Sequence, residues 1–145
     1  MSQTVDDVLR SAKLYSDGRL YRLVKLPQRA ITLAAGIVAE IGRPYCALIV
    51  DKDEVTLLMP DEARADFRAR LRQAQASERA YRLITLDLAL DPELVGLIAR
   101  LAAALAAVDI PILAFAAYSR DHLLVPAEDF DKAMRALSNL HKESA

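Results

Sequence analysis

The chain has 145 residues, a formal net charge of -1, one cysteine and four glycines. That length fits one compact domain or two very small units, and a hydrophobic content of 54% excludes a disordered chain. The near-neutral charge gives no reason to expect nucleic acid or an anionic membrane as a partner. The single Cys46 excludes a disulfide framework and a cysteine-based zinc site. The glycines are too widely spaced for a glycine-rich phosphate loop.

The first predicted element is a leading helix over residues 4–14, with Thr4 as its N-cap. Five elements are then expected in the order strand, helix, strand, strand, helix, at residues 21–26, 28–41, 45–50, 57–60 and 61–76. The strands are rich in β-branched residues, and the helices carry apolar stripes with acidic residues early and basic residues late. We interpret the arginines of the predicted helix over residues 61–76 as a solvated face, because acidic residues are interleaved with them.

The same order of elements then recurs, at residues 81–86, 92–108, 112–117, 123–126 and 127–140. The first strands read Tyr21-Arg-Leu-Val-Lys-Leu26 and Tyr81-Arg-Leu-Ile-Thr-Leu86, and both segments later read Leu-Leu-x-Pro-x-Glu. A chance likeness between two α/β segments explains this shared order less well than an internal duplication does. The sequence therefore predicts an N-terminal helical extension over residues 1–19 and two tandem βαββα repeats, over 20–78 and 79–145.

The middle strands of the two repeats, residues 45–50 and 112–117, are apolar throughout. Such strands are typical of sheets buried on both faces. Because helices cover only one face of a βαββα sheet, the other face needs a cover from the second repeat or from a second chain. We therefore expect a homodimer or close packing between the repeats.

The most apolar stretch, residues 94–118, raises the question of a membrane span. Arg100, Asp109 and Pro111 interrupt it, and a central arginine alone costs about 2.5–3.5 kcal/mol on insertion scales. We expect a helix, a turn and a strand of a soluble protein there, and no membrane association. Residues 2–19 are polar and contain no apolar run, so no secretory signal is expected and the cytoplasm is the predicted location.

Two segments of the second repeat resemble ACT domains, ferredoxin-like modules that often sense amino acids. Asp91-Pro-Glu-Leu-Val-Gly-Leu-Ile-Ala-Arg-Leu101 resembles the ACT turn and helix start, and Ile110-Pro-Ile-Leu-Ala-Phe-Ala-Ala-Tyr-Ser-Arg-Asp-His-Leu-Leu-Val125 is similar to small tandem-ACT proteins such as the arginine-sensing CASTOR type. The resemblance implies an α+β, ferredoxin-like fold of two tandem ACT-like repeats, with antiparallel sheets covered by helices. Tyr118 and Asp121 match the family pattern, whereas Ala116-Ala117 replace a Ser-Thr pair.

The candidate ligand site is the loop 90–96 facing the turn 118–122. Backbone N–H groups at the start of the 92–108 helix can hold a carboxylate, and Asp121 can pair with an α-amino group. The expected ligand-binding residues are Asp91, Glu93, Leu94, Val95, Gly96, Tyr118, Ser119, Asp121 and His122. The structural alternatives are that Asp91 is only an N-cap, that Asp121 is only a hairpin residue, and that Gly96 only permits close packing of a helix on a strand.

Other site chemistries are weakly supported, so we expect no catalytic residue, metal or cofactor. His122 follows Asp121 on a strand, where adjacent side chains face opposite sides, which disfavours an Asp–His dyad. His141 lies in a charged tail, and Cys46 lies in an apolar strand, where a thiol usually only packs. The strands lack the exposed aromatic residues of RNA-binding modules, and no CxxC pair of a metallochaperone is present.

These observations predict a non-enzymatic regulatory protein that binds a small molecule, with an amino acid as the first candidate. The alternative is an interaction or dimerisation module of the same fold that has lost its ligand, as the Ala116-Ala117 departure suggests. An enzymatic activity is the third and weakest reading.

Overall fold

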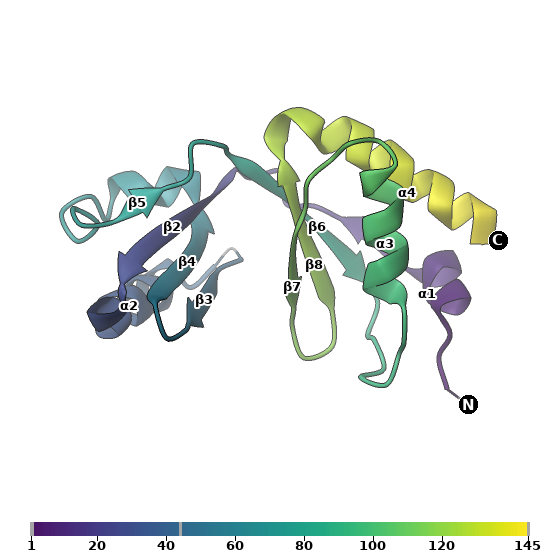
Figure 1. Cartoon of the computed structure of the whole chain (residues 1–145), viewed down its shortest axis with the longest axis horizontal. Coiled ribbons are helices and arrows are strands. Elements are labelled where there is room, and N and C mark those ends of the chain that lie inside the picture. The colour runs from purple at the N-terminus through teal and green to yellow at the C-terminus, as the bar shows by residue number, and fades with distance from the viewer. Residues whose placement is uncertain (1, 44, 145) are drawn as a thin grey trace. The chain divides into compact units, whose positions relative to one another are not determined.

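A computed structural model describes residues 2–43 and 45–144. The chain folds into two compact units (Figure 1). One unit combines Met1–Gly18 with Tyr81–Ala145, and the other consists of Arg19–Ala80. We call the first the split unit and the second the inserted unit. The extension predicted over residues 1–19 therefore lies, as far as Gly18, in the same unit as the second repeat.

The split unit contains α1 (Val5–Ser11), β1 (Lys13–Tyr15), β6 (Tyr81–Asp87), α3 (Leu97–Ala106), β7 (Leu113–Ala116), β8 (Asp121–Pro126), the 3-10 turn η3 (Ala127–Asp129) and α4 (Phe130–Ser144). Its strands form an antiparallel sheet in the order β1-β6-β8-β7. Thr4 caps α1 as predicted, and the Asp7 side chain completes a reciprocal capping box with it. The N-terminal segment is thus held by its own helix cap and by pairing of β1 with β6.

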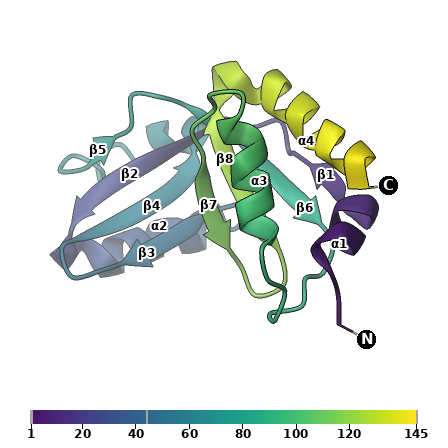
Figure 2. The ribbon, with the colours of Figure 1, turned by 45° about the vertical axis from the view of Figure 1, so that its right-hand side comes forward.

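The core of the split unit lies between one face of this sheet and the three helices α1, α3 and α4 (Figure 2). Alternate strand residues such as Ile84 and Leu86 face this core, as the two-residue period of a strand requires. Helix α3 contributes Leu97, Leu101 and Leu105, which fall on one stripe. This packing holds α3 and β8 against the same core.

The inserted unit contains β2 (Tyr21–Pro27), η1 (Gln28–Ala30), α2 (Ile31–Ile41), β3 (Ala47–Val50), β4 (Glu54–Pro60), η2 (Asp61–Ala65) and β5 (Gln75–Ala76). Its antiparallel sheet has the order β3-β4-β2-β5. A hydrophobic cluster of its own joins β2 and β4 to Ala34 and Ile37 of α2. The predicted α+β fold of two repeats, with antiparallel sheets covered by helices, is confirmed.

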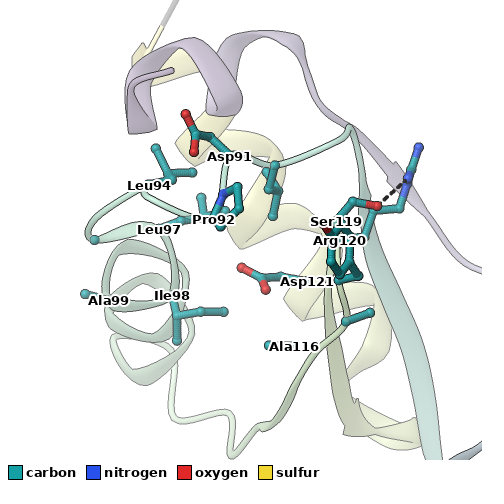
Figure 3. Close-up of a pocket in the computed structure, with 14 residues that line it drawn as sticks. Asp91, Pro92, Leu94, Leu97, Ile98, Ala99, Ala116, Ser119, Arg120 and Asp121 are labelled. Atoms are coloured by element: carbon teal, nitrogen blue, oxygen red, sulfur yellow. Dashed lines mark hydrogen bonds between the residues drawn. The ribbon is translucent and has the colours of Figure 1, made fainter. Parts of the chain in front are cut away.

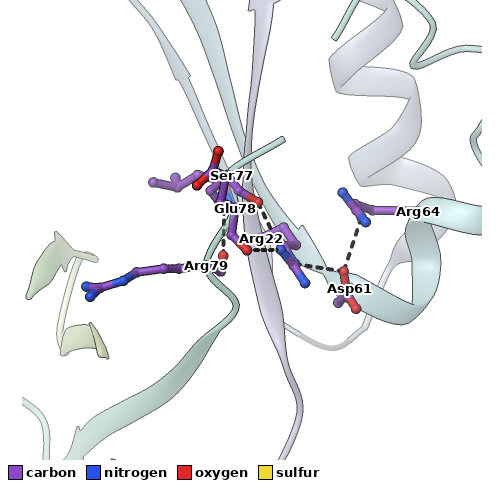
Figure 4. A network of polar contacts seen from close by, with 7 residues as sticks. Arg22, Asp61, Arg64, Ser77, Glu78 and Arg79 are labelled. Atoms are coloured by element: carbon purple, nitrogen blue, oxygen red, sulfur yellow. Dashed lines mark hydrogen bonds and ion pairs between the residues drawn. The ribbon is translucent and has the colours of Figure 1, made fainter. Parts of the chain in front are cut away.

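The helix predicted over residues 61–76 is wrong. The segment forms η2, a series of turns and the short strand β5. Figure 4 shows why the segment folds back: Arg22 of β2 donates Nε to Asp61 Oδ1 at 3.0 Å and Nη1 to the carbonyl oxygens of Ser77 and Glu78 at 2.9 and 2.6 Å. One arginine therefore ties both ends of the segment to β2, and a straight helix cannot satisfy both ends. The apolar stripe of Phe67 and Leu71 still packs on the core.

The middle strands of the repeats are less buried than the sequence predicted. They are the outer strands β3 and β7, and Ile49 and Val50 of β3 are 43% and 48% exposed. Residues along β7 alternate between half-buried and exposed. The prediction of burial on both faces is therefore wrong for these strands.

Within residues 2–43 and 45–144, no helix is both long enough and apolar enough to cross a membrane. The apolar stretch 94–118 divides into α3, a turn and β7, as predicted.

Candidate functional site

The candidate site lies in the split unit, where the 88–96 loop meets the turn between β7 and β8. The backbone N–H of Leu90 donates to the Ser119 carbonyl at 2.7 Å and joins the two segments. The turn itself is closed by a bond of 2.9 Å from the Ala117 N–H to the Arg120 carbonyl. Between these segments and the start of α3 lies a cavity of about 450 Å³ (Figure 3). That volume is in the range of small-molecule sites.

Asp91 shapes the loop instead of capping the helix. Its Oδ1 accepts the Glu93 N–H at 2.9 Å, and its carbonyl accepts the Leu94 N–H at 3.0 Å. The predicted helix start at residue 92 is therefore wrong, as is the N-cap role of Asp91. Helix α3 begins only after Gly96. The φ of Gly96 is 94°, in the left-handed region, so the right-handed helix cannot extend back through this residue.

The first turn of α3 leaves its amides open to the cavity. Gly96 offers no side-chain cap, and the first helical bond runs from the Arg100 N–H to the Gly96 carbonyl at 3.1 Å. The N–H groups of Leu97, Ile98 and Ala99 thus have no partner within the helix, and all three residues line the cavity. Together with the helix dipole, these donors favour an anionic group such as a carboxylate.

Asp121 places a carboxylate on another wall of the same cavity. It opens β8, and in Figure 3 its side chain extends toward α3. Among the residues that the structure describes, its carboxylate takes no hydrogen bond and forms no ion pair. Burial raises the pKa of Asp121, and the neighbouring His122 offsets part of that rise. A cationic ligand group would supply the missing partner.

Gln3 holds the loop from outside the cavity. Its Nε2 donates to the Ala89 carbonyl at 3.1 Å, and its Oε1 accepts the Asp91 N–H at 2.8 Å. The side-chain amide therefore joins the N-terminal segment to both sides of Leu90. Sequence reasoning missed this residue because the two contacts span more than 80 positions and leave no local pattern.

Arg120 lines the cavity, but its guanidinium is held at the rim. Its Nε donates to Asp87 Oδ1 at 3.1 Å, and its Nη1 lies 3.4 Å from Ser119 Oγ. Asp87 ends β6, so this ion pair ties the hairpin turn to the strand that leads into the loop. The arginine balances the charge at the rim, and the Asp121 carboxylate on the wall has no ion pair with any residue that the structure describes.

Six of the nine expected residues line the cavity: Asp91, Leu94, Gly96, Tyr118, Ser119 and Asp121. Glu93, Val95 and His122 do not. Val95 is 86% exposed, and Tyr118, although at the rim, is 98% exposed. His122 faces away from Asp121, as strand geometry predicts, and its Nδ1 lies 2.7 Å from Thr85 Oγ1.

The remaining walls were only partly foreseen from the sequence. Ala116 and Ala117, noted as departures from the family pattern, present methyl groups to the cavity. The expected ligand-binding residues did not include Pro92, Leu97, Ile98, Ala99 or Arg120. Ile98 reaches the cavity because α3 starts at Leu97, so the correct helix start was the signal needed to find it.

Comparisons with known proteins agree with this architecture. Residues 76–139 match the model of the ACT domain family, and no curated protein matches the chain. A protein from Agrobacterium tumefaciens is similar in structure, with a TM-score of 0.69 and 19% identity over 90% of this chain and 89% of that one. A protein of unknown function from Vibrio cholerae, described as a possible transport protein, has a TM-score of 0.68 and 24% sequence identity over 92% of each chain. The regulatory subunit of aspartate kinase from Thermus thermophilus has a TM-score of 0.64 and 15% sequence identity over 88% of this chain and 97% of that one.

Proposed function

We propose that this chain is a non-enzymatic regulatory protein that binds an amino acid in the cavity beside α3, a proposal supported by the match of residues 76–139 to the ACT domain model. The ACT match and the structural likeness to an aspartate kinase regulatory subunit support a regulatory, ligand-binding role. The observation that carries the finer proposal is a pair of opposite, unsatisfied groups in one cavity. The open amides of Leu97, Ile98 and Ala99 suit an α-carboxylate, and Asp121 suits an α-ammonium group.

The apolar walls suggest the class of amino acid. Leu94, Leu97 and Ile98 form one side, and the methyl groups of Ala116 and Ala117 form the other. A ligand side chain there finds few hydrogen-bond partners, because Arg120 already pairs with Asp87. We therefore propose a small apolar amino acid, since a polar side chain would lose hydrogen bonds to water that these walls do not replace.

Thermal unfolding in the presence of each of the twenty amino acids tests this proposal. A ligand at about 100 times its Kd raises the free energy of unfolding of the protein by about 2.7 kcal/mol. This corresponds to a rise in Tm of roughly 5–10 °C for a chain of this size. We expect that rise with valine, leucine or isoleucine, and little change with glutamate or arginine. Asp121→Asn should remove the rise, whereas Asp131→Asn, a control on the exposed side of α4, should keep it.

The second candidate is an interaction module that has lost its ligand, because Ala116 and Ala117 lack the hydroxyls of the family pattern. No change in Tm with any amino acid at millimolar concentration would favour this candidate over amino-acid binding. A rise that Asp121→Asn leaves intact would keep amino-acid binding but would place the ligand elsewhere.

We further propose that the protein is a cytoplasmic homodimer. The apolar outer strand β3, with Ile49 and Val50 exposed, supports a second copy as partner. The chain has a single cysteine, Cys46, and burial raises the pKa of its thiol, which suits a reducing compartment. Sedimentation equilibrium should give a dimer that Val50→Lys weakens. A monomer at all concentrations would contradict the dimer.

A further inference from the structure

A second cavity of about 400 Å³ lies in the split unit, and it shares no lining residue with the candidate site. It opens between the α1–β1 segment on one side and α3 and α4 on the other. Leu86, Leu101 and Leu137 form its inner wall, and the first two are each 1% exposed. The cavity is thus an apolar slot that enters the hydrophobic core of the unit.

Basic side chains surround the mouth of this cavity. Lys13 comes from β1, and His141 and Lys142 come from the last turns of α4. No acidic residue is among those that line it. Neither lysine forms an ion pair within residues 2–43 and 45–144, whereas Lys25 and Lys52 do. The mouth therefore carries positive charge that the described chain does not neutralise.

The acidic residue that pairs with Lys13 in the sheet already has a partner. Asp87 stands opposite Lys13 in the pairing of β1 with β6, but its carboxylate is paired with Arg120 at 3.1 Å. His141 Nδ1 contacts the Leu9 carbonyl oxygen and joins the end of α4 to α1 beside the opening. The basic mouth is therefore a built feature, in which one contact between helices holds α4 over the apolar slot.

We propose that this cavity binds a medium-chain carboxylate, with the alkyl chain against Leu86, Leu101 and Leu137 and the carboxylate beside Lys13 and Lys142. An apolar slot with a cationic mouth complements an amphiphile with an anionic head. A cationic head would be repelled by the two ammonium groups, and a neutral head would not balance their charge. This site is independent of the proposed amino-acid site.

Titration calorimetry with octanoate, decanoate and dodecanoate, each below its micelle-forming concentration, tests the proposal on the intact chain. Each added methylene should tighten binding roughly fourfold until the slot is full. Decyltrimethylammonium should not bind. Lys13→Glu and Lys142→Glu should each weaken decanoate binding about tenfold, whereas Lys132→Glu, an exposed control elsewhere on α4, should not.

The two sites can be separated by one more variant. Asp121→Asn should leave decanoate binding unchanged, so a failed amino-acid experiment does not decide this one. Equal binding of decanoate and decyltrimethylammonium would overturn the proposal, and so would the absence of any binding or an affinity that both lysine variants leave intact. Thermal unfolding of each variant shows that the fold is retained, as expected for substitutions of exposed lysines.

Discussion

Two neighbouring residues at the start of β8 have opposite roles. Asp121 lines the candidate site and has a pKa raised by burial, whereas His122 bonds Thr85 on the other face of the sheet. Burial also lowers the pKa of His122, so its neutral form is favoured. The alternation of a strand predicts this separation. The structure adds that only the carboxylate is available to a ligand in the cavity.

The raised pKa of Asp121 predicts an acid-sensitive amino-acid site. The ordinary value is 3.8, so protonation removes the partner of an ammonium group at a pH above the usual aspartate range. As the pH is lowered from about 7 to about 4, the affinity for the amino acid, measured by calorimetry, should therefore begin to fall at a higher pH than it would with an exposed carboxylate. An affinity that stays constant to pH 4 would contradict this assignment.

The effect of Asp121 on stability has the opposite sign. A carboxyl whose folded-state pKa is raised binds its proton more tightly in the native state. Its contribution to stability is therefore present below about pH 3.8 and is lost as pH rises through the raised pKa. Asp121→Asn should raise the free energy of unfolding of the ligand-free chain at pH 7, by on the order of 0.5 kcal/mol, while it weakens amino-acid binding.

Gln3 is predicted to act as a positioning residue for the 88–96 loop. Gln3→Ala removes both of its bonds, to the Ala89 carbonyl and to the Asp91 N–H, each of which is worth about 0.5–1.5 kcal/mol. Calorimetry should show amino-acid affinity reduced by roughly three- to tenfold, because the loop must then be ordered by the ligand. Gln28→Ala removes a long, exposed amide contact of 3.4 Å in the inserted unit and serves as the control. Equal effects of the two variants would contradict the positioning role.

At the scale of elements, the start of α3 decides the site. A helix beginning at Pro92 would direct its amides to a different place. The left-handed Gly96 delays the helix to Leu97 and brings Ile98 and Ala99 to the cavity. The sequence showed a proline after an aspartate, which is a normal helix start. It did not show that a separate turn at Asp91 precedes the helix.

A pair of glycine substitutions tests this account. Gly96→Ala should lower the free energy of unfolding by about 1–2 kcal/mol. An L side chain is strained at a φ of 94°, even though the space there is open. Gly36→Ala lies in the middle of α2, with nothing within 4 Å of the added carbon, and should stabilise by up to about 1 kcal/mol. Urea unfolding measures both. A stabilising Gly96→Ala would contradict the account.

At the scale of the whole molecule, the two repeats have diverged at the junction that forms the site. In the inserted unit, β2 ends at Pro27 and runs directly through η1 into α2. In the split unit, the 88–96 loop separates β6 from α3, and the N-terminal segment supports that loop through Gln3. One repeat therefore has the loop that forms a cavity, and the other has a closed connection.

This asymmetry predicts one amino-acid site per chain. Calorimetric titration should give a stoichiometry of one, although the chain contains two repeats. Hydrogen exchange should show that the ligand protects amides in the 88–100 segment, while those of α2 remain unchanged. Two equivalent sites per chain, or protection at the start of α2, would contradict the prediction.

The sequence by itself determined the repeated βαββ order, the cap at Thr4 and the two segments that meet at the candidate site, because these follow from local periodicity, cap chemistry and internal similarity. Only the tertiary structure decided that residues 61–76 are not a helix, since Arg22 binds both ends of that segment. It also decided that Gln3 supports the loop, and that residues 1–18 belong with residues 81–145. These contacts join positions far apart in the chain, and no local pattern of residues encodes them.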